Sequence, residues 1–221
     1  MDPGGGHRNS QKRYYIDNAL YFITTVTHQR FRYFTEPLLA ELFVHDLRFA
    51  ADLKQCDIHG YAVMPDHVHL LVWPRGKWKI SKFMATLKRN VARDTNIVLS
   101  NGNVIRNLIE GMDSHVEGAD SNPRLHENFQ ITHREHPHIT LEAYKHHFEI
   151  LHHIQHGLHS LNGAYHTIPK FQWQKSYRDH IIRNDRDYIH HLAYIYNNAM
   201  KHRIVENAEA WSWMWVTGLE E

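Results

Sequence analysis

The chain has 221 residues, of which 42% are hydrophobic and 12% aromatic, and its formal net charge at pH 7 is +1. This length and composition allow one hydrophobic core and exclude wholesale disorder, while the near-balance of charge gives no overall attraction to nucleic acid. Cys56 is the only cysteine, which excludes an internal disulfide framework and a zinc site made of cysteines. No segment has the length and apolar character of a signal-peptide core or a membrane span, so we expect a cytoplasmic protein without membrane contact.

The first hundred residues alternate between strand-like and helix-like patterns. A polar arm over residues 1–15 is expected to be flexible. Thr35 is the predicted cap of the first helix, and Pro37 lies in its first turn. Pro65-Asp66 is a turn signal between two short strands, which therefore predict an antiparallel hairpin. The predicted elements are a strand over 19–30, a helix over 36–55, strands over 57–65 and 68–73, and a helix over 79–97.

The composition changes between residues 98 and 168. Twelve of the 22 histidines lie in this stretch, and its loop-like first part is followed by helical periodicity over 139–161. We predict a surface insertion that is partly disordered and partly a helical hairpin; binding of additional metal ions, or of a partner or DNA, is the alternative. The apolar stripe of the hairpin would consist of Leu141, Tyr144, Phe148, Leu151, Ile154 and Leu158.

Regular patterns return after Pro169. A strand is predicted over 171–182 and a helix over 186–202, and we assign the final tryptophans to packing: Trp211, Trp213 and Trp215. The order of elements predicts an α+β fold, an antiparallel sheet with helices packed on it. In this interpretation residues 16–97 and 169–217 form a single domain, and 98–168 is a His-rich, partly helical insertion.

Two histidines open the second strand of the hairpin, in the sequence MPDHVHLLVW (64–73). Because side chains alternate across a strand, His67, His69 and Leu71 share one face, while Val68, Leu70 and Val72 face the core. The two imidazoles can bind one cation, although such a pair alone is more often an incidental feature of a half-exposed sheet. Asp66 either orients one of these histidines or serves the turn, and we favour the turn.

The last predicted helix carries candidates for the remaining parts of a site. Tyr194 and Asn198 are four residues apart and lie on one side of the helix, with His190 one turn earlier. A tyrosine can be a covalent nucleophile, and an asparagine carbonyl is a hard oxygen ligand. Taken alone, Tyr194 is more simply a core aromatic residue, and Tyr188 and Tyr196 compete with it for the role of nucleophile.

These motifs together resemble a known family. YAVMPDHVHLLVWP, with FQWQKSYRDHIIRNDRDYIHHLAYIYNNAMKHRIVENAEAWSW, is similar to the HUH single-tyrosine transposases and to their REP-associated (IS200-like) branch. The resemblance covers roughly residues 14–97 and 171–215. Two departures are the long insertion, where the family has a short link, and Asn198-Ala199, where relatives commonly have Asn-Pro.

The resemblance implies a ferredoxin/RRM-like HUH domain that nicks and transfers single-stranded, hairpin-containing DNA through a covalent tyrosyl–DNA intermediate. Carried over by position, Tyr194 attacks the phosphodiester, and His67, His69 and Asn198 bind a divalent cation, Mg²⁺ or Mn²⁺. The expected protein is a monomer or homodimer. One alternative is a DNA-binding module derived from a transposase that has lost strand transfer, and another is a metal-handling protein built around the insertion.

Binding of DNA would depend on a local concentration of positive charge, since the total charge is balanced. Residues 75–93, here called the basic segment, contain seven cations and no acidic residue, which favours phosphate contact over a solvated helix face of mixed charge. These cations are Arg75, Lys77, Lys79, Lys82, Lys88, Arg89 and Arg93. Stacking on unpaired bases and core packing are both open for Trp73, Trp78 and Trp173.

Overall fold

The computed structural model describes residues 16–75, 77–100, 138–160 and 164–218, together with 105, 106 and 109. Within them a five-stranded antiparallel sheet has the order β4-β1-β3-β2-β5, which confirms the predicted α+β class. The strands are β1 (Tyr21–Thr27), β2 (Cys56–Met64), β3 (His67–Pro74), β4 (Trp173–Ile181) and β5 (Met214–Val216). The helices are α1 (Pro37–Lys54), α2 (Ile80–Val98), α5 (Leu141–Ser160), α6 (Asp185–Tyr196) and α7 (Asn198–Lys201). Short 3₁₀ turns occur at His28–Arg30, Tyr33–Thr35, Ala164–Thr167 and Ala208–Ala210.

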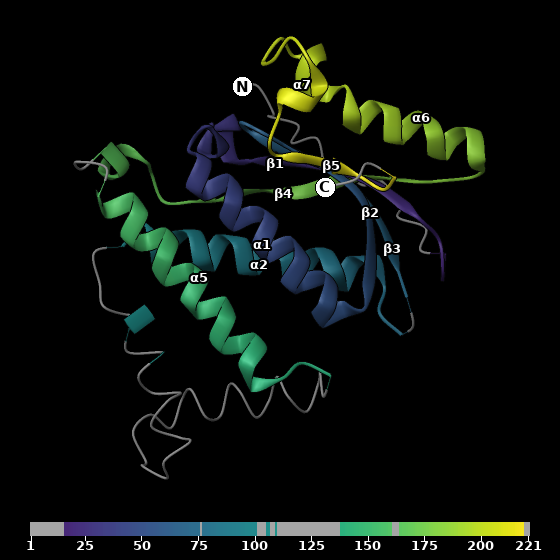
Figure 1. Cartoon of the computed structure of the whole chain (residues 1–221). Helices are drawn as coiled ribbons and strands as arrows, with labels where there is room; N and C mark the ends of the chain where they lie inside the picture. Colours follow the sequence, from purple (N-terminus) through teal and green to yellow (C-terminus); the bar gives the residue numbers. More distant parts are fainter. Residues whose placement is uncertain are drawn as a thin grey trace, which may run out of the picture.

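The helices cover the sheet from both sides: α1, α2 and α5 lie on one side, and α6 and α7 on the other (Figure 1). The side with α1 and α2 holds the larger core, in which Leu70 of β3 packs with Leu47 of α1 and Phe83 of α2. The opposite side holds a smaller apolar cluster, in which Leu71 packs with Ile195 of α6. Since Leu70 and Leu71 are neighbours on β3, the alternation of side chains along this strand separates the two layers.

The predicted hairpin is confirmed by the antiparallel pairing of β2 with β3. Met64 pairs with His67 and Ala62 with His69, so the chain reverses at Pro65 and Asp66. On its other side β3 pairs with β1, where Thr24 is opposite His69. The two histidines thus lie at the centre of the sheet, on the face covered by α6 and α7.

The start of the first helix differs from the prediction by one residue. Thr35 lies in the preceding 3₁₀ turn, where its hydroxyl donates to the Arg32 carbonyl. The cap is Glu36, whose carboxylate accepts a hydrogen bond from the Leu38 N–H, with Pro37 as the first helical residue. A Thr-Glu pair offers two possible caps one residue apart, and the 3₁₀ turn uses the first of them.

Helix α5 belongs to the predicted insertion and packs on α1 and α2. Its buried side chains include Leu151, Ile154 and Leu158, which join the larger core, and also His147. The other predicted stripe positions, Leu141, Tyr144 and Phe148, are half-buried. The predicted flexible arm (1–15) and most of the first half of the insertion (101–137) lie outside the described residues.

Truncation of Leu151 tests the docking of α5. Leu151 is fully buried among residues of the larger core, so Leu151→Ala is expected to lower the free energy of unfolding by about 2–5 kcal/mol. Urea denaturation followed by circular dichroism measures this difference. The half-exposed neighbour Ile150 is the control, and equal small effects of Ile150→Ala and Leu151→Ala would contradict the docking.

The C-terminal aromatic cluster packs as predicted and also extends the sheet. Trp211 donates its indole N–H to the Val63 carbonyl over 3.1 Å, and Trp213 and Trp215 pack against the larger core. β5, which was not predicted as a strand, pairs with residues 60–62 of β2. No helix within the described ranges has both the length and the hydropathy needed to cross a bilayer.

Candidate active site

Each ring of the histidine pair (His67 and His69) is oriented by a hydrogen bond at its Nδ1 atom. The Nδ1 atom of His67 lies 2.6 Å from Asp66 Oδ1, and Nδ1 of His69 lies 2.8 Å from Thr24 Oγ1. The ring centroids are 4.9 Å apart. When both Nδ1 atoms carry the proton and donate it, the lone pairs of both Nε2 atoms become available to a cation. Nε2 of His69 is buried and has no hydrogen-bond partner among the described residues.

The surroundings of the pair favour uncharged imidazoles. Burial, together with electrostatic repulsion by His67, His202 and Lys201, lowers the pKa of His69 to about 3. Burial also lowers the pKa of His67, against the opposing effect of the Asp66 carboxylate. Both rings are therefore neutral at pH 7, which is the form that binds metal ions.

Asp66 orients His67 in addition to its place in the turn, which corrects our preference for the turn alone. Burial alone would raise the pKa of Asp66, but the hydrogen bonds from His67 and from Arg30 outweigh it and lower the pKa. The Asp66 carboxylate is 3.0 Å from the Arg30 guanidinium. Asp66 is thus an anion beside the Nδ1–H of His67, where it fixes both the tautomer and the ring orientation.

Tyr194 reaches the histidine pair from α6. Its ring lies edge-on to His69, with centroids 5.1 Å apart and planes at 83°, and it also contacts Phe22 of β1 at 5.7 Å. The Lys201 Nζ atom is 4.9 Å from the centre of the Tyr194 ring. Helix α6 begins at a cap in which the Asn184 side chain accepts from the Asp187 N–H, and this fixes where the helix begins.

The other two tyrosines of α6 are engaged elsewhere. The Tyr188 hydroxyl is 2.9 Å from Nδ1 of His59, and the Tyr196 hydroxyl donates to the Glu209 carboxylate at 3.3 Å. Among the three, only Tyr194 contacts the histidine pair in the described part of the chain. The geometry therefore distinguishes Tyr194 from its competitors, which the sequence alone does not.

Asn198 lies four residues beyond Tyr194, at the start of α7, and its side-chain amide is buried without a hydrogen-bond partner among the described residues. Burying an amide without partners is costly. Two neutral imidazoles and an amide oxygen form a donor set that fits a divalent cation, so these residues pass the chemical test for a metal site.

The structure adds three residues to this region that the sequence analysis missed. Thr24 holds His69, as described above; the His202 ring centroid is 5.7 Å from that of His67; and Lys201 lies over Tyr194. His202 and Lys201 fall within the predicted helix over 186–202, so their helical positions were a usable signal. His190, expected on the side of Tyr194, is exposed, and its neighbour His191 is the imidazole that contacts Phe22.

Four cations of the basic segment belong to α2 and lie on the other side of the sheet, because α2 packs into the larger core: Lys82, Lys88, Arg89 and Arg93. Three cations of the basic segment have protein partners: Arg75 pairs with Asp57, Lys88 donates to the Gln174 carbonyl at 2.6 Å, and Arg93 binds both oxygens of Asp94. The side chains of the remaining members are exposed: Lys77, Lys79, Lys82 and Arg89. The structure thus places the α2 part of the basic segment and the histidine pair on opposite sides of the sheet.

The tryptophans considered for base stacking also have protein contacts. Trp173 packs against Phe34, Phe43 and Phe171, which favours core packing over stacking. Cations cover the other two rings: Arg75 lies 4.2 Å from the Trp73 ring centre, and Lys54 lies 4.0 Å from that of Trp78.

Comparison with known proteins agrees with this arrangement. Residues 15–104, which include the histidine pair, match the family described as "Transposase IS200 like". We call residues 15–104, which are similar to this family, the IS200-like region. A REP-associated tyrosine transposase of Escherichia coli (strain K12) is 46% identical to the chain over 39 residues, which are 18% of this chain and 24% of that protein. A Haemophilus influenzae protein has the same identity over the same length, 22% of its own chain.

The similarity outside the IS200-like region is one of fold. A solved structure of a REP-associated tyrosine transposase bound to a REP hairpin matches with a TM-score of 0.51 and 18% identity, over 92% of this chain and 79% of that one. The sequence matches span less than a quarter of the curated relatives. Tyr194 and Asn198 lie beyond the IS200-like region, and their connection to it is the packing of α6 and α7 on the sheet.

Proposed function

We propose that this protein nicks and rejoins single-stranded, hairpin-containing DNA, with Tyr194 as the nucleophile. The observation that carries the proposal is the contact of the Tyr194 ring with His69. His69 and His67 form a pair in which each Nδ1 atom is hydrogen-bonded, so that the Nε2 atoms are left for a cation. The IS200-like family supports a nuclease activity of this type. Among solved structures, the relative bound to a REP hairpin supports the choice of a structured DNA substrate.

In this proposal His67, His69 and Asn198 hold a divalent cation, and Mg²⁺ or Mn²⁺ fits the oxygen ligands that an amide and a phosphate supply. When bound, the cation neutralises negative charge on the phosphate oxygens of the DNA. Thr24 and Asp66 orient the two imidazoles. His202 lies close to His67, so its imidazole can bind the cation or a phosphate oxygen of the DNA.

The reaction exchanges one phosphoester bond for another. The phenol oxygen of Tyr194 forms a bond to phosphorus, the bond to the leaving deoxyribose oxygen breaks, and the proton lost by the phenol ends on that leaving hydroxyl. Lys201, near the Tyr194 ring, stabilises the negative charge that develops on the phenol or phosphate oxygens. The tyrosyl–DNA ester keeps the energy of the broken bond, so a second DNA hydroxyl can reverse the step and join the strand elsewhere.

A covalent-adduct assay tests the proposed reaction. The protein is incubated with Mg²⁺ or Mn²⁺ and end-labelled, hairpin-bearing single-stranded DNA, and the products are separated on denaturing gels. The proposal expects a labelled protein band that depends on the cation and on the hairpin. Retention of the DNA on native gels without a covalent band would instead support a DNA-binding module without strand transfer.

We propose that the basic segment contributes to DNA binding through its exposed members. Each phosphate contact with single-stranded DNA contributes about 0.7 to the slope of log K against log salt. Replacing Lys79, Lys82 and Arg89 by Gln is therefore expected to weaken binding at low salt and to reduce this slope by about 2. Fluorescence anisotropy over a salt series measures it.

The control for this prediction is Arg48→Gln, which removes an exposed cation of α1 outside the basic segment. An unchanged slope in the triple variant would show that the DNA passes over the α6 side of the sheet alone.

We also propose that residues 16–97 and 169–217 form the catalytic domain and that 98–168 is inserted into it, with α5 as the part of the insertion that joins the core.

A further inference from the structure

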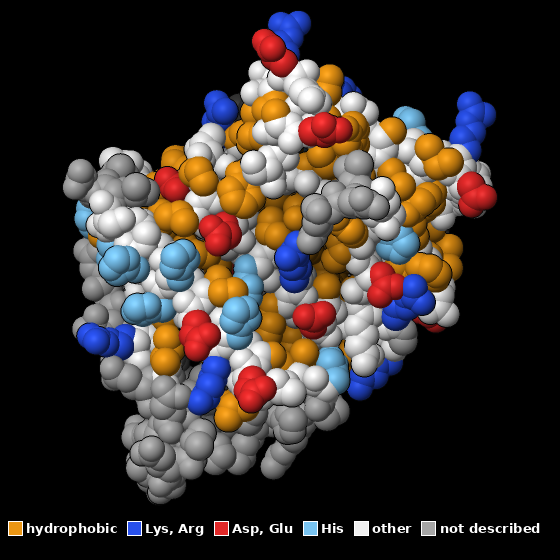
Figure 2. All heavy atoms as spheres, in the orientation of Figure 1, with side chains coloured by type: hydrophobic (Ala, Val, Ile, Leu, Met, Phe, Trp, Pro, Cys, Tyr) orange, Lys and Arg blue, Asp and Glu red, His pale blue; other side chains and the backbone are white. Residues whose placement is uncertain are grey.

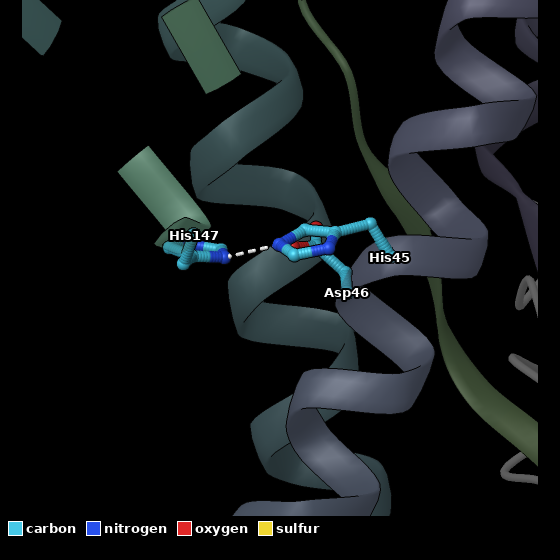
Figure 3. Close-up of side chains that lie close together, drawn as sticks. All are labelled: His45, Asp46 and His147. Carbon is cyan, nitrogen blue, oxygen red and sulfur yellow. Dashed lines mark hydrogen bonds between the residues drawn. The ribbon is translucent and has the colours of Figure 1, made fainter. Parts of the chain in front are cut away.

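Three helices meet at a buried group of ionisable side chains on the side of the sheet away from the histidine pair. His45 and Asp46 belong to α1 and His147 belongs to α5 (Figure 3). The His45 Nε2 and His147 Nδ1 atoms are 2.8 Å apart, and one ligand atom from each of the three residues lies within 4.8 Å of the others. We call these three residues the helix-junction cluster.

Asp46 is the anomalous member of the helix-junction cluster. Its side chain is fully buried, and neither carboxylate oxygen has a hydrogen-bond partner among the described residues. Burial raises the pKa of Asp46 well above its usual range, and the nearby Asp94 carboxylate raises it further. A buried carboxylate without a donor is costly unless a cation or a proton neutralises it.

The neighbouring arginine serves this purpose only in part: the charge of Arg93 lowers the pKa of Asp46, but less than burial and Asp94 raise it. Arg93 of α2 binds both oxygens of Asp94, at 2.5 and 2.7 Å, so its charge compensates Asp94 directly. His147 Nε2 is 3.3 Å from the second oxygen of Asp94. This leaves two ways to neutralise Asp46: a proton shared with Asp94, or a cation held between Asp46 and the two histidines.

The two histidines favour a cation. Burial lowers the pKa of His45 to about 4, with contributions from His147 and His146, so its imidazole is neutral and carries a lone pair. His147 is 1% exposed, while His45 is half-buried and leaves a route for an ion and a water molecule. Two imidazole nitrogens bound to one tetrahedral zinc ion at 2.0–2.1 Å are about 3.4 Å apart, so binding requires the observed contact to open only slightly.

We propose that His45, Asp46 and His147 bind a transition-metal ion of the type that prefers imidazole, such as Zn²⁺ or Ni²⁺, and that this ion fastens α5 to α1. Two nitrogens and one carboxylate oxygen form a common three-residue donor set for zinc, with water as the fourth ligand. The site differs from the proposed active site in ligand preference and in location, since it lies in the α1–α5 layer (Figure 1).

Exposed histidines on α5 set the main experimental difficulty. Figure 2 shows histidine side chains gathered on the surface over α5, and the exposed ones on this helix are His146, His152, His153 and His156. They offer weak sites for the same ions, so a test must separate them from the buried cluster.

The test uses the full chain with His67→Ala and His69→Ala, which removes both imidazole ligands of the proposed active site. In this background Asp46→Asn removes the negative charge of one ligand, and His147→Gln removes one imidazole ligand of the helix-junction cluster. The double change His152→Ala and His153→Ala is the matched control on the exposed side of α5. Zn²⁺ binding is measured by competition with a chromogenic chelator, and Co²⁺ is added separately to record its visible absorption.

The background protein is expected to bind one Zn²⁺ more tightly than any others and to give the intense visible bands of four-coordinate Co²⁺. Each ligand variant should weaken the tight site at least about tenfold and lose these bands, while the surface control keeps both. Zn²⁺ should also slow hydrogen exchange over residues 141–160 in the background protein and not in Asp46→Asn.

The proposal is overturned if the background protein binds no Zn²⁺ tightly, because a proton shared between Asp46 and Asp94 then accounts for the cluster. It is equally overturned if Asp46→Asn binds Zn²⁺ and Co²⁺ as the background does. Asn replaces Asp with the same shape and without the charge, so this variant decides the matter even where His147→Gln does not fold.

Discussion

Tyr194→Phe is expected to abolish the covalent protein–DNA adduct, with a decrease in its rate of formation of at least about a thousandfold. The substitution removes one oxygen atom and leaves the ring in place against His69 and Phe22, so the packing of α6 is preserved. DNA binding should be nearly unchanged, since the cation ligands and the exposed cations are intact. Quantitative denaturing gels for the adduct, with native gels for binding on the same samples, separate these two effects.

Tyr188→Phe and Tyr196→Phe are the matched controls. Both tyrosines lie in α6, and both hydroxyls are hydrogen-bonded away from the histidine pair, to His59 and to Glu209. Each control should retain the adduct. If the adduct persists in Tyr194→Phe and disappears in one of the controls, the assignment of the nucleophile is wrong, even though the proposed reaction type survives.

The parts of the candidate site that were predictable from sequence are those governed by local periodicity. The alternation of β3 places His67 and His69 on one face without knowledge of the other strands. The expected shared side of Tyr194 and Asn198 stays a prediction, since the helix is divided between them. The hairpin followed from Pro65-Asp66 because turn chemistry is also local.

The remaining parts of the site depend on strand register and on packing. Thr24 meets His69 because β1 pairs with β3 in one particular register, and a shift by one residue would place Phe22 or Thr24 on the opposite face. The predicted helix over 186–202 is divided at Asn197, which is not helical in its backbone angles, and this determines where Lys201 and His202 point. Neither feature has a local signature.

The same distinction applies to the basic segment and to α5. Composition alone identified seven cations in residues 75–93, but it did not indicate that α2 would face the larger core on the side away from Tyr194. The apolar stripe of α5 was predictable from period 3.6, whereas the burial of His147 was not, because its partners His45 and Asp46 lie about a hundred residues earlier in α1. A buried histidine in such a stripe is recognisable only once its partners are known.

His69→Ala is expected to have the second large effect, on cation binding and on adduct formation together. His69 is 4% exposed, and its Nε2 atom has no hydrogen-bond partner among the described residues. In the proposed site, the cation is therefore the partner of this nitrogen. We expect Mn²⁺ affinity, measured by electron paramagnetic resonance of the free ion, to fall by more than about a hundredfold, and the adduct to decrease in parallel.

Thr24→Val provides a graded comparison, because it keeps the His69 ligand and removes only the hydrogen bond to its Nδ1. Loss of such an orienting partner costs about 10–100-fold in metal affinity, so the variant should fall between the original protein and His69→Ala. His190→Ala changes an exposed imidazole of the same helix as Tyr194 and should have no effect. A Thr24→Val protein that binds Mn²⁺ as tightly as the original, together with an intact adduct in His69→Ala, would mean that the histidine pair has no part in holding the cation.

The order of effects on Mn²⁺ affinity, with His69→Ala largest, Thr24→Val intermediate and His190→Ala without effect, distinguishes a metal ligand from a merely structural histidine. A histidine that only packed against Tyr194 would leave Mn²⁺ affinity unchanged in all three variants.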